Sequence, residues 1–168
     1  MKTPEEWAAL TLVTESDQPH EWWPIAWVLR YRVASQRFPD TMKEVVLQER
    51  HFSAWNPWTH GKFKGKFPLE EIWHELWKTL DQATQEKLYP VALQCASLIL
   101  PRPATGSAPT LQGQPAWQAP FGPEVCWYYS PEKMIPKGTA PTWAAKAART
   151  FTPSGIDPAR FVFCEDVQ

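Results

Sequence analysis

The chain has 168 residues, a formal net charge of −1 and an isoelectric point near 6.4. This length predicts one domain with a core of ordinary size, and the small net charge argues against a broad basic field that would gather nucleic acid or anionic lipid over long distances. Eleven tryptophans and eighteen prolines, against only seven glycines, suggest aromatic platforms and rigid loops rather than flexible linkers.

The cysteines and the N-terminal segment limit the class of protein further. Cys95, Cys126 and Cys164 are far apart and odd in number, which argues against a disulfide framework or a zinc site. The N-terminal segment has no apolar signal core, and no stretch approaches the length of a membrane span. We therefore expect a soluble chain that is made in the cytoplasm, binds no metal or cofactor, does not bind nucleic acid and does not insert into a membrane.

The first expected element is a helix over residues 4–15. The segment "TPEE" at residues 3–6 is a capping box with proline at the first helical position, and apolar residues follow at helical spacing. The polar residues after Glu15, together with Pro19, are expected to stop this helix.

A second, largely buried helix is predicted from "EWWPIAWVLRYRVAS", with Pro24 in its first turn, where a missing N–H costs little. Phe38-Pro39-Asp40 is then a turn, and a second capping box at residues 41–44 begins a short helix that extends to about residue 48. Residues 55–67 are expected to form a loop.

The later elements complete an α+β fold that is mainly α. Helices are predicted from Pro68 to about Leu80 and from about Pro90 through "YPVALQCASLIL", followed by a proline-rich surface loop at residues 101–123. The runs "EVCWYYS" and "RFVFCE" are expected to pair as strands, separated by a helix at "PTWAAKAART". Most tryptophans in helical patterns are expected to fill the core: Trp7, Trp27, Trp73 and Trp77.

Glu15 is a candidate general acid. The C-terminal end of a helix carries partial negative charge, which disfavours an ionised carboxylate there and tends to raise its pKa. A carboxylic acid that stays protonated near neutral pH can donate a proton to a glycosidic oxygen. The alternative is an ordinary exposed glutamate at a helix end.

The segment "PIAWVLRYRVASQRFPDTMKEVVLQERHFSAWN" resembles the core of the SleB-type cell-wall hydrolases, the spore-cortex-lytic enzyme family, which has phage and Gram-negative members. The family's Asn-Arg-Val-like, Phe-Pro and Gln-Phe-Ser-like elements correspond here to Tyr31-Arg32-Val33, Phe38-Pro39 and His51-Phe52-Ser53. The segments "VCWYYSPEKM", "APTWAAKA" and "RFVFCE" are similar to a second block of the family. In both blocks this chain departs from the pattern, with Tyr31, His51 and Ser130 where the family has Asn, Gln and Asn.

The resemblance implies a lysozyme-like single catalytic domain over residues 1–168 that degrades peptidoglycan glycan strands. The family's catalytic glutamate corresponds to Glu15, with Glu21 as a second candidate. The implied reaction cleaves the β-1,4 bond between N-acetylmuramic acid and N-acetylglucosamine. Because Asp17 is too close in sequence to Glu15 to serve as a partner across a sugar ring, a lytic transglycosylase with one acid is favoured over a hydrolytic muramidase, which needs a second carboxylate.

Substrate contacts are expected from hydroxyl and aromatic side chains near the resemblance blocks, with plain packing as the alternative for each: Tyr31, His51, Ser53, Trp55, Trp58, Tyr128 and Tyr129. The lack of a signal peptide suggests a phage lysis enzyme or a virion-associated enzyme that penetrates the wall. The alternative from another class is a non-catalytic peptidoglycan-binding or structural virion protein on the same scaffold.

Overall fold

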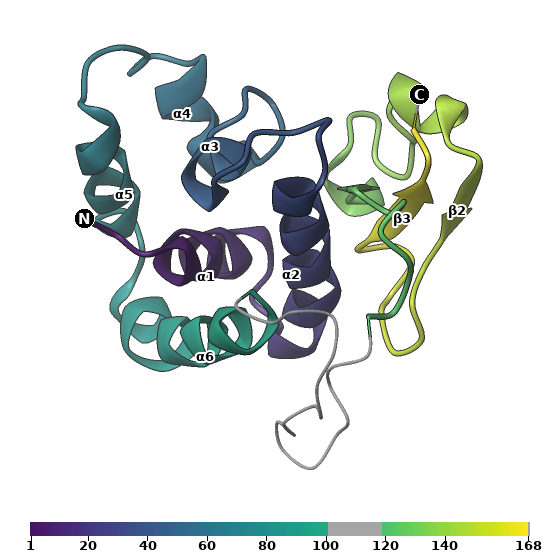
Figure 1. Ribbon diagram of the computed structural model, residues 1–168, viewed down its shortest axis with the longest axis horizontal. Helices are drawn as coiled ribbons and strands as arrows, with labels where there is room; N and C mark the ends of the chain where they lie inside the picture. The colour runs from purple at the N-terminus through teal and green to yellow at the C-terminus, as the bar shows by residue number, and fades with distance from the viewer. Residues whose placement is uncertain (101–118, 168) are drawn as a thin grey trace. The chain divides into compact units, whose positions relative to one another are not determined.

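A computed structural model of the chain describes residues 1–100 and 119–167. The chain divides into two compact units, Met1–Gln118 and Ala119–Gln168; the first is helical and the second contains the sheet (Figure 1). The predicted α+β class, mainly α, is therefore confirmed. The single catalytic domain stays a prediction, and most of the proline-rich loop predicted at 101–123 lies outside the described residues.

In its described part, the first unit has six α-helices: α1 (Pro4–Glu15), α2 (Pro19–Ala34), α3 (Met42–Val46), α4 (Asn56–Thr59), α5 (Leu69–Trp77) and α6 (Tyr89–Ile99). A 3₁₀ turn (Ser53–Trp55) precedes α4, and a π-helical turn (Thr84–Leu88) precedes α6. No helix in the described ranges is both long enough and apolar enough to cross a bilayer.

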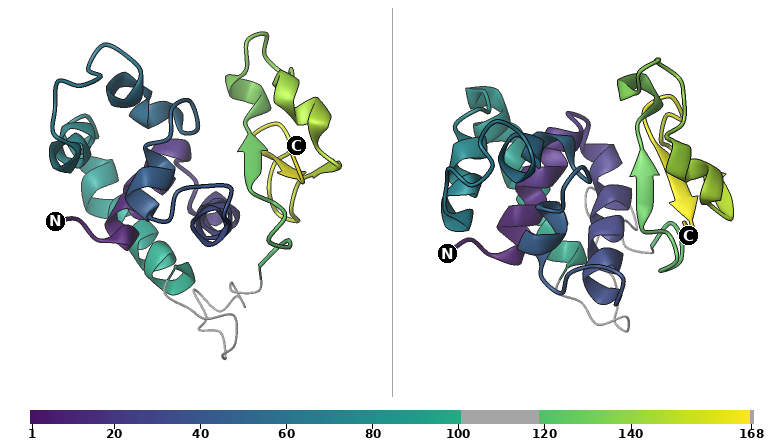
Figure 2. Two further views of the ribbon diagram at one scale, coloured as in Figure 1. Left: turned by 45° about the horizontal axis from the view of Figure 1, so that its top comes forward. Right: turned by 90° about the horizontal axis from the view of Figure 1, so that it is seen from above.

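Helix α1 is the central helix of this unit and packs against α2, α3, α5 and α6 (Figures 1 and 2). Its capping box is confirmed: the Glu6 N–H donates to Thr3 Oγ1 at 3.2 Å, and the Thr3 N–H donates to Glu6 Oε2 at 2.8 Å. The helix ends at Glu15, as predicted, where the Ser16 N–H donates to the Leu12 carbonyl at 3.0 Å. Since neighbours surround α1, its residues from Trp7 to Val13 are all buried.

The predicted start of α2 is wrong. The helix begins at Pro19, so that Pro24 lies inside it rather than in its first turn. Proline has no N–H, so one helical hydrogen bond is missing at that position. Packing compensates, because Ile25, Val28 and Leu29 are each 0% exposed on the buried side of the helix.

The short helices also differ from the sequence expectation in their ends. Helix α3 has the predicted N-cap, since the Glu44 N–H donates to Thr41 Oγ1 at 3.3 Å, but it ends at Val46 rather than near residue 48. The predicted loop at 55–67 contains α4, which has Pro57 in its first turn. Helix α5 ends at Trp77 and is followed by turns up to Leu80.

The second unit contains a three-stranded antiparallel sheet in the order β1-β3-β2, made of β1 (Trp127–Tyr129), β2 (Arg149–Phe151) and β3 (Val162–Glu165). The predicted pairing of the two aromatic runs is confirmed, with Tyr128 opposite Phe163. The predicted helix at "PTWAAKAART" is only partly correct: residues 142–146 form a 3₁₀ helix, and the end of the segment is β2. Thr150 and Phe151 suit a strand, and pairing with β3 places them in one.

Candidate functional site

Glu15 is the last residue of α1 and is only 9% exposed. The alternative of an exposed glutamate at a helix end therefore does not describe this side chain. Its carboxyl group is thus largely removed from water and lies at the negative end of the helix dipole.

Glu21 is 0% exposed in the first turn of α2 and accepts a hydrogen bond from the Ser16 hydroxyl. Ser16 Oγ in turn accepts the Gln18 N–H at 2.9 Å, and the Ser16 carbonyl accepts the Trp22 indole N–H at 2.8 Å. These bonds fix the turn that directly follows Glu15. One oxygen of Glu21 is therefore engaged in holding the turn between α1 and α2.

A buried charge lies near the C-terminal end of α2. Arg32 is 2% exposed, and its guanidinium carbon lies 5.1 Å from the ring centre of Phe38 and 5.0 Å from that of Phe52. Its Nη1 lies 3.4 Å from His51 Nδ1; because a guanidinium can only donate, Nδ1 acts as the acceptor. The structure thus brings three elements of the first resemblance block together around one arginine.

The pKa of His51 is lowered from 6.5 to about 4, chiefly by burial and further by the positive charge of Arg32. The imidazole is therefore neutral near pH 7. A neutral hydrogen-bonding group therefore lies beside the Arg32 guanidinium.

Of the other polar candidates in the first unit, Tyr31 is half-buried and Ser53 is exposed. The Tyr31 ring packs against Trp27, with 5.5 Å between ring centres, and Ser53 begins the 3₁₀ turn before α4. Both side chains keep some surface that a ligand can reach.

The expectation that Trp55 and Trp58 stack on sugars is not supported by their burial. Trp55 is 0% exposed, lies 5.3 Å from the Trp7 ring and donates its indole N–H to Thr11 Oγ1 at 3.0 Å. Trp58 is 7% exposed and lies 5.7 Å from the Phe63 ring. The 3₁₀ turn and α4 fold these rings into the core, so neither offers a free face to a sugar.

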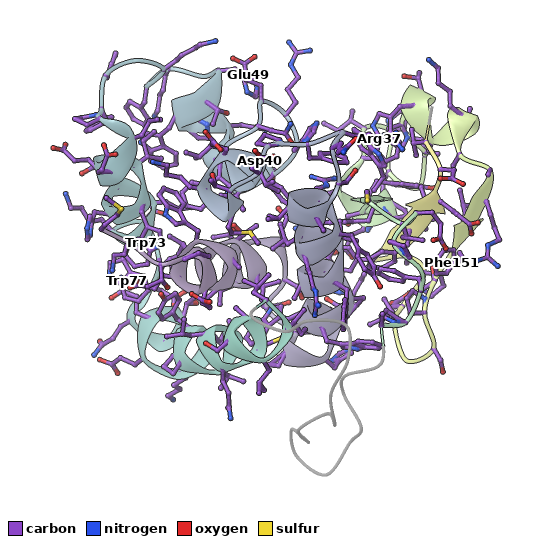
Figure 3. All side chains as sticks on the ribbon, in the orientation of Figure 1. Arg37, Asp40, Glu49, Trp73, Trp77 and Phe151 are labelled. Carbon is purple, nitrogen blue, oxygen red and sulfur yellow. The ribbon has the colours of Figure 1, made fainter. Side chains whose placement is uncertain are left out.

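The four tryptophans expected in the core divide into two pairs. Trp7 and Trp73 are each 3% exposed, whereas Trp27 and Trp77 are half-buried. The Trp73 and Trp77 rings stack with 5.2 Å between their centres on α5 and lie one above the other in Figure 3.

The two tyrosines of β1 are half-buried and belong to the second unit. Tyr128 packs against Phe161 and Phe163, at 5.8 and 5.6 Å between ring centres. Tyr129 lies 6.0 Å from the Trp143 ring, and its pKa is raised by burial and by Cys164.

Sequence reasoning missed an aromatic cluster that includes Tyr129. The ring of Trp127 lies 5.4 Å from that of Trp143, so Trp127, Tyr129 and Trp143 form a three-ring group, all half-buried. The signal was available, because residues 127 and 129 must share one face of a strand. Only their approach to Trp143, which is distant in sequence, was not predictable from spacing.

A pocket of about 700 Å³ was also missed. It lies in the first unit, at the N-terminal end of α1 rather than at the end that carries Glu15, and is lined by Met1, Lys2, Pro4, Glu6, Trp7, Thr41, Met42, Lys43, Glu70 and His74. Its charged groups are engaged with one another: Lys2 pairs with Glu6 at 2.9 Å, and Lys43 lies 3.7 Å from Glu70.

Within residues 1–100 and 119–167, no group of three or more His, Cys, Asp or Glu side chains is arranged to hold a metal ion. The chain matches no protein-family model, no curated protein and no solved structure.

Proposed function

We propose that this chain is a peptidoglycan glycosidase with a lysozyme-like catalytic unit, which cleaves the β-1,4 bond between N-acetylmuramic acid and N-acetylglucosamine as a lytic transglycosylase. The observation that carries the proposal is the burial of Glu15, 9% exposed, at the C-terminal end of α1. The resemblance of residues 24–56 to SleB-type hydrolases supplies the substrate class. The proposed role is cell lysis or wall penetration by a phage.

In the proposed reaction, the protonated Glu15 carboxyl donates its proton to the glycosidic oxygen as the bond from that oxygen to C1 breaks. Positive charge develops on the muramyl C1 and ring oxygen. The Glu15 carboxylate then takes the proton of the same sugar's C6 hydroxyl, and this oxygen bonds to C1. The products are a 1,6-anhydro end and a free 4-hydroxyl group, and the enzyme recovers its proton.

A single acid fits the neighbouring carboxyl groups better than a pair does. Glu21 is engaged by Ser16 in the turn after α1, and Asp17 is exposed. A hydrolase that works with two carboxylates needs the second one across the sugar ring from the first. We therefore assign Glu21 to positioning the turn, and we keep Tyr31 and Ser53 as candidate substrate contacts.

The test is digestion of purified peptidoglycan by wild type, Glu15→Gln and the control Asp17→Asn, which removes an exposed carboxylate two residues away. Loss of a general acid costs about 10²- to 10⁴-fold in rate. We expect this loss of rate in Glu15→Gln, which should still bind peptidoglycan in a sedimentation assay. The control Asp17→Asn should keep near wild-type activity. Mass spectrometry of wild-type products should show ends one water lighter than reducing ends.

The outcomes separate the alternatives. Products with reducing ends would identify a hydrolytic muramidase. Equal activity of wild type and Glu15→Gln would remove Glu15 as the acid. Binding of peptidoglycan by wild type without any product would instead identify a non-catalytic wall-binding or virion protein.

A further inference from the structure

The segment between α4 and α5, residues 61–67 with the sequence "GKFKGKF", concentrates positive charge in a chain whose net charge is only −1. We call it the lysine–phenylalanine loop. Figure 1 shows this part of the chain arching away from the helices at the edge of the first unit. All three of its lysines, Lys62, Lys64 and Lys66, are exposed.

The loop has a defined backbone. The Phe63 N–H donates to the Pro57 carbonyl at 2.8 Å, the Lys64 N–H to Gly61 at 3.1 Å and the Lys66 N–H to Phe63 at 3.0 Å. A Cβ on Gly61 would lie 2.8 Å from Pro57 Cα, so the chain can pass this close only with glycine. These bonds fold the loop back on itself and gather its side chains.

Two of the three lysines lie beside the ring of Phe63. The Nζ atoms of Lys62 and Lys66 lie 4.7 and 6.0 Å from the centre of the Phe63 ring, and Phe63 and Phe67 lie 6.0 Å apart. Both rings are half-buried. Just beyond them Leu69 is 52% exposed, which adds apolar surface beside the cations.

Acidic neighbours offset only part of this charge. Glu49, labelled in Figure 3, pairs with Lys64, and the adjacent Arg50 is exposed. The exposed Glu71 in the first turn of α5 is a second carboxylate, so four cations and two carboxylates, Glu49 and Glu71, leave an excess of two positive charges in this patch. Glu70 at the start of α5 is directed to Lys43, at 3.7 Å.

We propose that the lysine–phenylalanine loop is a peripheral contact site for a bilayer surface rich in anionic phospholipid. Lysines near an anionic leaflet each strengthen binding, by about fivefold per lysine, and phenylalanine and leucine side chains of a lysine-rich surface segment enter the boundary between headgroups and acyl chains. A linear polyanion requires only charge, whereas this loop combines clustered cations with half-exposed rings and an exposed leucine. The site is distinct from Glu15 and does not depend on the proposed glycosidase activity.

The test is sedimentation of the full chain with vesicles of phosphatidylglycerol and phosphatidylcholine, or of phosphatidylcholine alone, at low and high salt. We expect binding to the anionic vesicles only, weakened by salt. The triple variant Lys62→Gln, Lys64→Gln, Lys66→Gln should lose about 100-fold in partition. The variant Leu69→Ser, at an exposed position, should lose a few-fold in partition onto the same vesicles.

The matched control changes three exposed lysines elsewhere, Lys87→Gln, Lys137→Gln and Lys146→Gln, and so alters net charge equally. It should bind like wild type. Equal loss in both triple variants, equal binding to neutral vesicles, or no vesicle binding by wild type would overturn the proposal. So would tighter, equally lysine-dependent binding to inorganic polyphosphate, which would indicate a soluble polyanion. If the triple variant loses its circular dichroism, the single variants Lys62→Gln and Lys66→Gln must each show about a fivefold loss.

Discussion

The hydrogen bond between Thr11 and Trp55 provides a quantitative test of the packing around α1. Both side chains are 0% exposed. Thr11 Oγ1 donates to the Trp7 carbonyl at 2.9 Å and accepts the Trp55 indole N–H at 3.0 Å. Substitution Thr11→Val keeps the shape of the side chain but leaves that N–H buried without its acceptor.

An unsatisfied buried donor costs about 1–3 kcal/mol, and we expect Thr11→Val to lower the free energy of unfolding by this amount. The Trp7 carbonyl keeps its helical partner, so most of the loss comes from the indole. In a Trp55→Phe background no indole donor is present. There Thr11→Val should lower the free energy of unfolding by at least about 1 kcal/mol less than it does in the wild-type background.

The measurement is urea unfolding followed by far-ultraviolet circular dichroism for the two single variants and the double variant. Thr14→Val serves as the control, because Thr14 only donates to the backbone carbonyls of Leu10 and Thr11. It should cost about 0.5 kcal/mol or less. If the effects of Thr11→Val and Trp55→Phe on the free energy of unfolding add up in the double variant to within about 0.5 kcal/mol, the proposed role of the hydrogen bond is refuted.

Three further predictions concern titratable groups. The pKa of His51 is lowered from 6.5 to about 4, so between pH 6.5 and pH 4 the unfolded chain binds more protons than the folded chain. The free energy of unfolding should therefore fall as the pH decreases through this window. In His51→Gln the urea midpoint should fall less steeply with decreasing pH, and a pH dependence equal to that of wild type would contradict the lowered pKa. Arg32→Met should raise the His51 pKa part of the way in an NMR titration, with burial still holding it below 6.5. Burial raises the pKa of Cys95 to about 12 and that of Cys164 to about 11, so a disulfide reagent should label these thiols slowly in the native protein and fully in urea; rapid native labelling would contradict their burial.

Local signals predicted the elements that depend on local interactions. The capping residues of α1 and the N-cap of α3 mark helix starts through bonds between residues three apart, and both were found. The pairing of β1 with β3 followed from two aromatic runs with strand composition. The burial of Glu15 was not predicted, because it depends on the surroundings of the helix end.

The elements that were missed depend on partners distant in sequence. Strand β2 exists because Thr150 lies opposite Cys164 on β3, and residues 149–151 alone continue a helical pattern. Trp55 was expected near the surface because its segment is rich in loop formers, yet it bonds to Thr11, 44 residues earlier. Net charge likewise gave no sign of the lysine–phenylalanine loop, since a sum over the chain hides where charges gather.

The turn after Glu15 is held by hydrogen bonds that join residues only two, five and six positions apart. Contacts with such short sequence separation close quickly and need little of the remaining chain to be in place. The backbone that carries the candidate acid can therefore form early in folding and persist while distant parts of the sequence diverge. A homologue with little overall identity would be recognisable by a buried glutamate in this position and a serine and second glutamate that close the turn behind it.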